Sequence, residues 1–255
     1  IDDDHNQISL KKVIFSNFQN PTFNGGAIYI NKNRFNTTLS NCKFENCFGK
    51  FGGAIYVKSK DNSNTQSCSI YNAIFTNCRA TKGGALYLKV GYTERHSITI
   101  EGCTFKINFA SENGGAIYGH SREKLSIQRC RFENNIANLK GSSIWCLVGD
   151  ENGRKHNKLI LYRNSFEFAA NENNLVNVYI QSNTLNDSNN ANANVYLGLC
   201  SFQSTNESFT EYKNLQVFED GKFESFNLTE CNCIQGNEET VSIDVNTTTN
   251  YSNYL

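Results

Sequence analysis

The hydrophobic positions of this chain recur with a period of roughly 30 residues. In each unit a phenylalanine closes a short apolar stretch, and branched or small apolar residues stand seven, five and two positions before it. The closing residues are Phe15, Phe44, Phe75, Phe105, Phe132, Phe166 and Phe202. Units of this size that bury an apolar face against their neighbours form solenoids. The pattern therefore predicts stacked repeats, with the phenylalanines in one buried column.

Within each unit the apolar residues form two pairs, one at seven and five residues before the phenylalanine and one at two residues before it and at the phenylalanine itself. Each pair alternates as residues on one face of a strand do, but the two pairs could not lie on the same face of one straight strand. Side chains alternate faces along a strand, so this predicts two short strands with a bend between them. A third β-prone piece has two glycines followed by a small, a branched and an aromatic residue. Its copies are Gly25–Tyr29, Gly52–Tyr56, Gly83–Tyr87, Gly114–Tyr118 and, more weakly, Gly141–Trp145. Three strands a turn without a helical period predict an all-β fold, a single-stranded parallel β-helix.

The same template extends into the carboxy-terminal part of the chain. Cys233 stands where the phenylalanine is expected, 31 residues after Phe202, and Val241–Val245 falls where the glycine-rich strand is expected. We therefore expect about eight coils. The predicted organisation is a β-helix over residues 1–245 and a tail rich in Thr and Asn over residues 246–255.

Charge and hydropathy exclude two classes of partner. The formal net charge of the 255 residues is zero, which gives no electrostatic footprint for nucleic acid or an anionic membrane. No stretch approaches the roughly 20 apolar residues of a spanning helix, so we expect no membrane insertion.

Six Asn-x-Ser/Thr motifs indicate passage through a secretory pathway, with N-linked glycans as the expected modification. They are Asn36, Asn186, Asn206, Asn227, Asn246 and Asn250. Asn36, Asn186 and Asn206 are expected in loops between strands. Chance occurrence in a chain so rich in asparagine is the alternative. Asn17, Asn46, Asn77 and Asn134, each two residues after the phenylalanine, are expected to form a side-chain ladder along the stack.

Ten cysteines also favour an oxidising compartment. Three pairs occupy equal positions on successive units: Cys47 with Cys78, Cys103 with Cys130, and Cys200 with Cys231. Stacked residues have Cα atoms about 4.8 Å apart, which a disulfide accepts, although the Cβ separation is a little long. Each pair is therefore a disulfide candidate, and buried free thiols that fill space are the alternative. The disulfide is preferred for Cys47 and Cys78, near a corner where the geometry is looser.

The repeated Gly-Gly-Ala-Ile/Leu and Phe-x-x-Asn motifs resemble the passenger repeats of the chlamydial polymorphic outer-membrane proteins. They are also similar to repeats in surface proteins of some microbial eukaryotes. Phe105–Asn108 and Phe132–Asn135 match the second motif, whereas Phe44–Cys47 and Phe75–Cys78 place the asparagine one position earlier. The paired motifs cover residues 15 to about 145. The resemblance implies a right-handed β-helix at a cell surface, with adhesion as the usual role.

Parallel β-helices also serve as polysaccharide lyases and glycosidases, so an enzyme or a carbohydrate-binding module is the rival reading. Glycoside hydrolysis requires two carboxylates that face one cleft. Only Glu133 and Glu167 are acidic neighbours in the row that follows the phenylalanine, and an exposed glutamate row is more often a solvated face. The Cys231 and Cys233 spacing does not suit zinc. We therefore predict no catalytic residues, no cofactor-binding residues and no metal site.

These observations predict an extracellular structural or adhesive surface glycoprotein, with a fibre or stalk as one form. Its expected partners are copies of itself, other surface proteins or glycans. Loops on one edge of a solenoid often create its binding face, and here Tyr92, Arg95, His96 and residues 147–158 are the first candidates.

Overall fold

The computed structural model describes most of the chain and consists of strands. The described residues are 7–32, 35–59, 66–89, 96–121, 124–149, 157–168, 176–182, 193–204, 213–219, 223–229, 231–235, 238–239 and 243–246. The predicted all-β parallel β-helix is confirmed over these segments. Within this described part of the chain, no helix has the length and apolar character needed to cross a bilayer.

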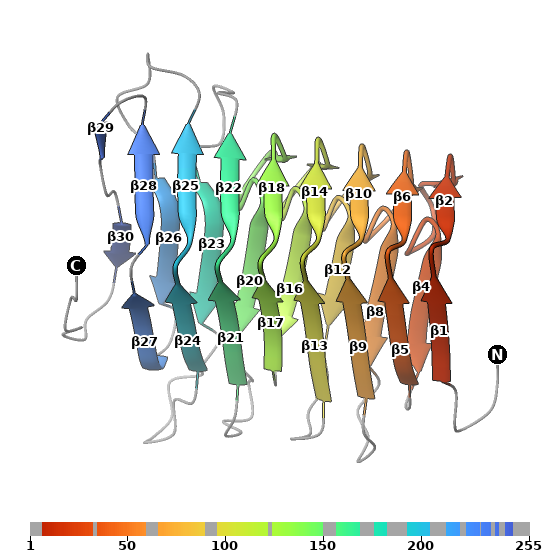
Figure 1. Cartoon of the computed structure of the whole chain (residues 1–255), viewed down its shortest axis with the longest axis horizontal. Coiled ribbons are helices and arrows are strands. Elements are labelled where there is room, and N and C mark those ends of the chain that lie inside the picture. Colours follow the sequence, from red (N-terminus) through yellow and green to blue (C-terminus); the bar gives the residue numbers. More distant parts are fainter. Residues whose placement is uncertain are drawn as a thin grey trace.

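Two long sheets form the front of the solenoid in Figure 1. Sheet A contains β1 (Gln7–Lys11), β5 (Phe35–Ser40), β9 (Gln66–Tyr71), β13 (His96–Glu101), β17 (Lys124–Gln128), β21 (Asn157–Tyr162), β24 (Ala193–Gly198) and β27 (Phe223–Thr229). Sheet B contains β2 (Ile14–Ser16), β6 (Lys43–Glu45), β10 (Ile74–Thr76), β14 (Thr104–Lys106), β18 (Arg131–Glu133), β22 (Ser165–Phe168), β25 (Ser201–Ser204), β28 (Asn232–Gln235) and β29 (Glu238–Glu239). These are the two strand pieces predicted before each phenylalanine.

The other two sheets complete the turn. Sheet D lies behind sheets A and B in Figure 1 and contains β4 (Ile28–Lys32), β8 (Ile55–Ser59), β12 (Leu86–Lys89), β16 (Ile117–Ser121), β20 (Ile144–Val148), β23 (Val176–Ser182), β26 (Lys213–Glu219) and β30 (Ile243–Asn246). Sheet C is short and contains β3 (Gln19–Asn20), β7 (Phe48–Gly49), β11 (Arg79–Ala80), β15 (Phe109–Ala110) and β19 (Ile136–Ala137).

Sheet C corrects the prediction of three strands a turn. In the described residues, five turns carry strands of all four sheets, and the later turns contribute to sheets A, B and D only. The number of complete turns is therefore five, fewer than the eight coils expected, although sheet A continues to an eighth strand. In Figure 1 the chain rises along sheets A and B, crosses the top and descends along sheet D while advancing to the left. This path is right-handed.

The phenylalanine column is confirmed. Phe75 pairs with Phe44 on one side and Phe105 on the other, and the ring centroids are 4.8 and 4.9 Å apart with nearly parallel planes. From Phe44 to Phe202 each anchor is at most 2% exposed. Phe202 pairs with Cys233, as the template predicts, and β30 occupies the place expected for Val241–Val245. Strands separated by about 30 residues therefore lie directly above one another.

Three corners of each of the first five turns adopt a left-handed backbone, which glycine and asparagine tolerate better than most residues. One corner holds Asn17, Asn46 and Asn77, with φ between 50 and 62°. The predicted amide ladder is confirmed there, since Nδ2 of Asn46 donates to Oδ1 of Asn17 at 3.1 Å and Nδ2 of Asn77 donates to Oδ1 of Asn46 at 2.7 Å. Ile107 takes this corner in the next turn, with φ 54°, and separates Asn134 from the ladder.

Candidate functional site

The acidic pair Glu133 and Glu167 lies in a network of ion pairs on the outside of sheet B. Arg131 joins the two glutamates, at 2.6 Å from Nε to Oε1 of Glu133 and 3.0 Å from Nη2 to Oε2 of Glu167. Lys106 adds a second cation to Glu133 at 3.2 Å. These carboxylates are engaged by side chains of their own sheet, which is the arrangement of a surface ion-pair network. The geometry does not favour them as a hydrolytic pair.

The outer face of sheets A and B repeats this arrangement at other turns. Lys43 pairs with Glu45 at 2.6 Å, and Arg129 pairs with Glu101. Within the described residues, no group of three or more His, Cys, Asp or Glu side chains is placed to hold a metal ion. The acidic side chains named here are therefore paired with Lys or Arg side chains of the same outer face.

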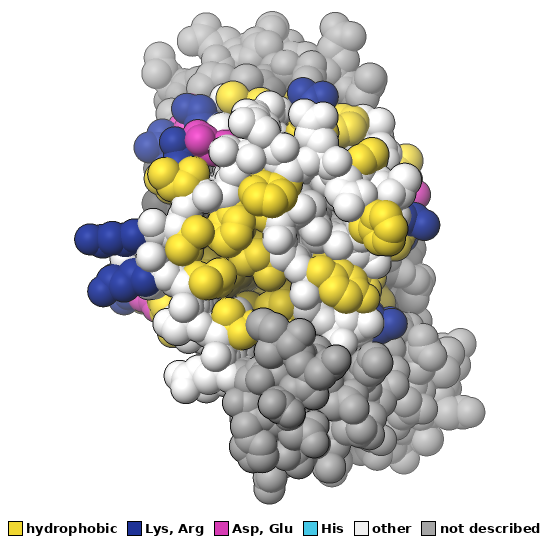
Figure 2. All heavy atoms as spheres, turned by 90° about the vertical axis from the view of Figure 1, so that its right-hand side faces the viewer, with side chains coloured by type: hydrophobic (Ala, Val, Ile, Leu, Met, Phe, Trp, Pro, Cys, Tyr) yellow, Lys and Arg dark blue, Asp and Glu magenta, His cyan; other side chains and the backbone are white. Residues whose placement is uncertain are grey.

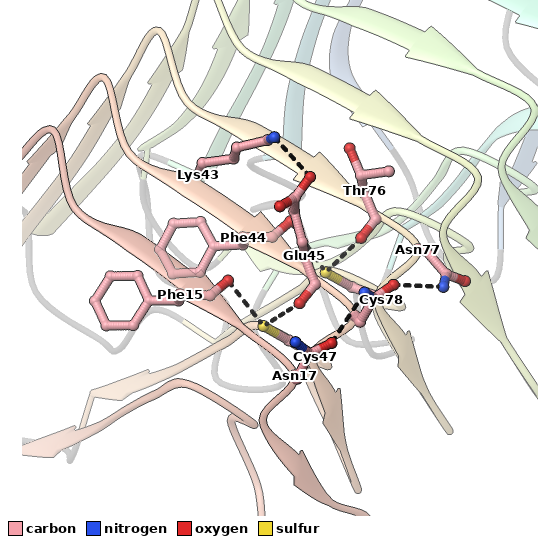
Figure 3. A network of polar contacts seen from close by, with 10 residues as sticks. Phe15, Asn17, Lys43, Phe44, Glu45, Cys47, Thr76, Asn77 and Cys78 are labelled. Carbon is pink, nitrogen blue, oxygen red and sulfur yellow. Dashed lines mark hydrogen bonds and ion pairs between the residues drawn. The ribbon is translucent and has the colours of Figure 1, made fainter.

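The predicted cysteine pairs lie together as thiols. Cys47 lies next to Cys78 in the stack, and the same holds for Cys103 with Cys130 and for Cys200 with Cys231. The nine cysteines whose side chains the structure describes, all except Cys233, are free. The predicted stacking of the three cysteine pairs is thus observed, and the side chains are thiols in this structure. Disulfide formation stays a prediction. Figure 3 shows the first pair beside the stacked rings of Phe15 and Phe44.

These thiols hydrogen-bond to the backbone at the corners. Sγ of Cys103 accepts from the N–H of Ala73 at 3.4 Å and donates to the carbonyl of Ile70 at 3.5 Å. In the later turn that carries Asn164, the amide makes the equivalent pair of bonds, from the N–H of Cys130 and to the carbonyl of Ile127, both at 2.9 Å. Cysteine and asparagine side chains therefore make equivalent hydrogen bonds to the backbone in this column. A disulfide between stacked cysteines would remove both S–H donors.

A second inner column shows the same exchange. Cys47 and Cys78 donate to carbonyls of the preceding turn, those of Phe15 and Phe44. Asn108 and Asn135 follow them in the stack, fully buried, and Asn108 accepts from the N–H of Cys78 at 2.9 Å. Sequence reasoning missed these buried amides. The signal was the asparagine that stands three residues after Phe105 and Phe132, at the position that cysteine occupies in the two preceding turns.

Replacing Cys103 with asparagine is expected to change the free energy of unfolding by less than about 1 kcal/mol. Replacing it with alanine should lower that free energy by about 1–3 kcal/mol, because the buried carbonyl and N–H lose their partner. Urea unfolding followed by circular dichroism measures both. If the asparagine variant loses as much free energy of unfolding as the alanine variant, the thiol mainly fills space and its hydrogen bonds contribute little to stability.

Alkylation with iodoacetamide near pH 8 is expected to modify Cys231 first. The neighbouring Cys200 thiol lowers the pKa of Cys231 to about 7, and Cys231 is partly exposed. Burial raises the pKa of Cys68 and Cys146 to about 12, so both stay protonated and unreactive in the folded chain. Mass spectrometry of tryptic peptides follows the modification.

Cys231→Ser is the control, and it should remove the fast phase. The same labelling in denaturant without reductant decides between thiols and disulfides, because only thiols react. A Cys200 and Cys231 pair that reacts only after reduction would establish the disulfide and contradict the expected order.

The glycosylation candidates fall into three groups. Asn36 lies within β5 and not in a loop as expected; its side chain is exposed and Oδ1 accepts a hydrogen bond from Ser67 at 2.9 Å. Asn227 lies in β27 and Asn246 ends β30. Asn186, Asn206 and Asn250 lie outside the described residues, as do residues 247–255 of the predicted tail. Occupancy by glycans stays a prediction at all six.

The predicted binding loops are mostly outside the described residues. This holds for Tyr92, Arg95 and residues 150–156, whereas His96 is the first residue of β13 and residues 147–149 end β20 or follow it. The partner-binding role of these loops stays a prediction.

An aromatic column runs along the outside of sheet D. Tyr29, Tyr56, Tyr87, Tyr118 and Trp145 stack in order, with ring centroids 4.4–5.2 Å apart. Lys82 and Lys140 place ammonium groups over Tyr118 and Tyr179, at 5.6 and 4.5 Å from the ring centroids. Burial raises the pKa of Tyr56 to about 12. The rings use their faces on one another, and Tyr56 and Trp145 are only 7% exposed, so little of this column is open to a ligand.

The amino-terminal end of the solenoid exposes apolar side chains of the first turn. Figure 2 views this end and shows hydrophobic side chains gathered on it. Four of the seven exposed large hydrophobic residues in the described chain belong to this turn: Ile14, Phe18, Phe23 and Tyr29, between 44 and 67% exposed. Phe15 and Leu10, which belong to buried columns in later turns, are only partly buried here. We call this surface, formed by β1 to β4 and their corners, the amino-terminal end face.

The other end is arranged differently. After β28 the chain forms β29, which pairs antiparallel with β28 through Ile234–Glu239 and Gln235–Glu238. β29 therefore lies on the outer edge of the last parallel strand of sheet B. The edge that would continue sheet B is occupied at this end and open at the other.

One turn in the middle of the stack is similar to a known repeat. Residues 102–120 match the family model of the Chlamydia polymorphic membrane protein repeat. The resemblance inferred from the motifs is thereby confirmed over this segment. No curated protein and no solved structure matches the chain.

The segment that matches the polymorphic membrane protein repeat contains the structural positions of a turn. Gly102 forms the left-handed corner before the anchor Phe105, and Asn108 supplies the buried amide after it. Gly114 and Gly115 then turn the chain into β16. The matched segment thus contains residues that shape the turn and stack it on its neighbours.

Proposed function

We propose that the chain is a rigid β-helical segment of an extracellular surface protein, with a structural or adhesive role. The match of residues 102–120 to a membrane-protein repeat supports a surface location. The observation that carries the proposal is the register of sheet A, which is unbroken through its first seven strands, with the core columns in step. Such a stack resists bending and projects its side faces, which suits a stalk or an adhesin.

A catalytic role has less support. The acidic pair that a glycosidase would use is held by Arg131 and Lys106 on an outward sheet face. The outer rows are ion pairs and amide ladders, and these serve the stability and solubility of the stack. We therefore propose a scaffold that acts through its surface, and N-linked glycans at sites such as the exposed Asn36 belong to that surface.

Antibodies against the folded chain, applied to the cells that produce it, test the location. Intact cells should stain, and external protease should remove the signal. Staining that needs permeabilised cells would contradict the proposal. The adhesive role is tested with beads that carry the purified chain, which should attach to cells or immobilised glycans. Beads that carry an unrelated β-helical protein are the control, and equal attachment would leave only a structural role.

Glycosylation is tested by secretion from a eukaryotic host followed by peptide N-glycosidase and mass spectrometry. A mass loss in the parent chain that is smaller in Asn36→Gln supports a glycan at this site. An identical loss in both chains would exclude Asn36 as an acceptor.

A further inference from the structure

We propose that the stacked thiols of Cys200 and Cys231 form a two-ligand site for one soft monovalent cation, such as Cu(I). The site depends on the stacking of the turns and is independent of the proposed surface role. Thiolate ligands select soft cations, and Cu(I) is stable with two sulfur ligands on opposite sides. The cysteine spacing that excludes zinc, which takes four ligands, does not apply to a cation that takes two.

The backbone holds the two cysteines one above the other. β24 pairs with β27 just before them and β25 with β28 just after them, both parallel and in register at the ends next to the cysteines. Between these strands the N–H of Leu199 donates to the carbonyl of Thr229 at 2.9 Å. The two thiols are adjacent in the stack, and each changes the pKa of the other. Two sulfur ligands are therefore fixed by the strand ladder on either side of them.

The spacing between turns suits a bridging cation better than a disulfide. Stacked strands lie about 4.8 Å apart, and the ring centroids of Phe166 and Phe202 in the neighbouring column are separated by 4.8 Å. A metal–thiolate bond is about 2.3 Å long, so two collinear bonds span about 4.6 Å. A disulfide requires sulfur atoms about 2.05 Å apart and Cβ atoms about 3.8 Å apart, which would draw the two turns together. A cation joins the thiols with less movement of the backbone.

The two thiols differ in burial, which gives the site an entrance. Cys200 is 1% exposed, whereas Cys231 is partly exposed. The neighbouring Cys200 thiol lowers the pKa of Cys231 to about 7, so a thiolate is present slightly above neutral pH. The neighbouring Cys231 and burial raise the pKa of Cys200, so its proton leaves only when a positive charge replaces it. Binding to the thiol–thiolate pair therefore exchanges one proton, released to solvent, for one Cu(I).

The hydrogen bonds that these thiols lose on binding are weak. Cys200 donates to the carbonyl of Gly198 at 3.6 Å, and Cys231 donates to that of Thr229 at 3.7 Å. Thiols are weak donors. Both carbonyls also accept a backbone N–H of the preceding turn at 2.9 Å, so they keep a partner when the thiol protons leave.

Two further thiol pairs share the stacking but not the entrance. Their members are at most 2% exposed: Cys47 with Cys78, and Cys103 with Cys130. A cation reaches these pairs only when the turns separate. We therefore expect the pair of Cys200 and Cys231 to take up the first equivalent of Cu(I).

The test titrates the whole chain, reduced and held under nitrogen, with Cu(I) in competition with a coloured Cu(I) chelator. The first equivalent should give the ultraviolet charge-transfer band of a copper–thiolate bond, and X-ray absorption should find two sulfur neighbours around the copper. Zn(II) should bind much more weakly, because zinc requires four ligands. A folded, reduced chain that takes up no Cu(I), copper with three or more ligands, or equal affinity for Zn(II) would overturn the proposal.

Two substitutions separate the stacked pair from a lone thiol. Cys231→Ser removes the partly exposed ligand and should weaken binding of the first equivalent more than about tenfold. Cys42→Ala is the matched control and should stay within about threefold, because Val13 and Ala73 hold the position of Cys42 in the adjacent turns. Circular dichroism checks that both variants are folded.

Alkylation of the parent chain gives an independent readout. One equivalent of Cu(I) should slow the reaction of Cys231 with iodoacetamide more than about tenfold, because the bound thiolate is no longer free to react. Equal Cu(I) affinity of Cys231→Ser and the parent, or alkylation of Cys231 at an unchanged rate, would contradict the site.

Discussion

Replacing Gly84 with alanine is expected to lower the free energy of unfolding by more than about 3 kcal/mol. A Cβ at Gly84 would overlap the carbonyl oxygen of Gly115 and lie 2.6 Å from that of Phe109, both in the next turn. These are backbone atoms of the stacked ladder, held by hydrogen bonds such as Gly84 N–H to Gly114 O at 3.1 Å. They cannot move aside without separating the turns.

Gly102→Asn is the matched control. Unlike Gly84, Gly102 has a left-handed backbone, with φ 65°, but its Cβ would meet the end of the Asn72 side chain and no carbonyl of the stacked ladder. The same corner holds Asn41, Asn72 and Arg129 in other turns, with φ between 51 and 54°. We therefore expect a change of less than about 1 kcal/mol. Urea unfolding by circular dichroism compares the two variants, and equal midpoints for Gly84→Ala and the parent would contradict the close approach.

The fold could be predicted because stacking in register imposes one pattern on every turn. The anchor Phe75 sits between Phe44 and Phe105 in space, and the same three residues are about 30 apart in sequence. Any residue that fills a column must suit both neighbours, so the column is visible as a repeated residue type. The buried alanines of the glycine-rich strand, such as Ala54 and Ala85, were predictable for the same reason.

Sheet C was missed because its strands have no alternating pattern. Each has two residues, and Phe48, Arg79, Phe109 and Ile136 share one position with no common chemistry. Their pairing follows from the main chain, which leaves no trace in side-chain type. β23 was missed for a related reason: it keeps the sheet D alternation at Val178 and Tyr179 but lacks the two glycines that marked the earlier copies.

The candidate site was less predictable because it depends on contacts between side chains that occupy different positions of the repeat. The acidic row containing Glu133 and Glu167 was visible in the sequence, but Arg131, which neutralises it, belongs to the row on the other side of the anchor. Likewise, Cys103 and Cys130 both stand two residues before an anchor phenylalanine, which indicates that they stack but not whether they form a disulfide. That choice depends on the carbonyls and N–H groups around each thiol. The hairpin that places β29 on β28 is a local reversal outside the repeat.

Replacing Phe105 with alanine is expected to lower the free energy of unfolding by about 3–5 kcal/mol. Phe105 is fully buried, and its ring stacks on Phe75 and Phe132, both at 4.9 Å, with interplanar angles of 4 and 6°. The substitution removes apolar volume and breaks the column on both faces, and the ladder hydrogen bonds prevent the neighbouring turns from closing the gap. Urea unfolding measures the loss, and hydrogen exchange should place it in the turns next to Phe105, because a solenoid transmits stability between neighbours.

Phe15→Ala is the matched control at the open end of the same column. Phe15 stacks on Phe44 alone at 4.8 Å and is only partly buried, so its removal leaves a notch that water can fill in place of an internal cavity. We expect less than half the cost of Phe105→Ala. Equal costs at the two positions would mean that stability comes from the strand ladders and not from the column. A large difference, with exchange faster only around Phe105, would assign the rigidity of the stack to its aromatic core.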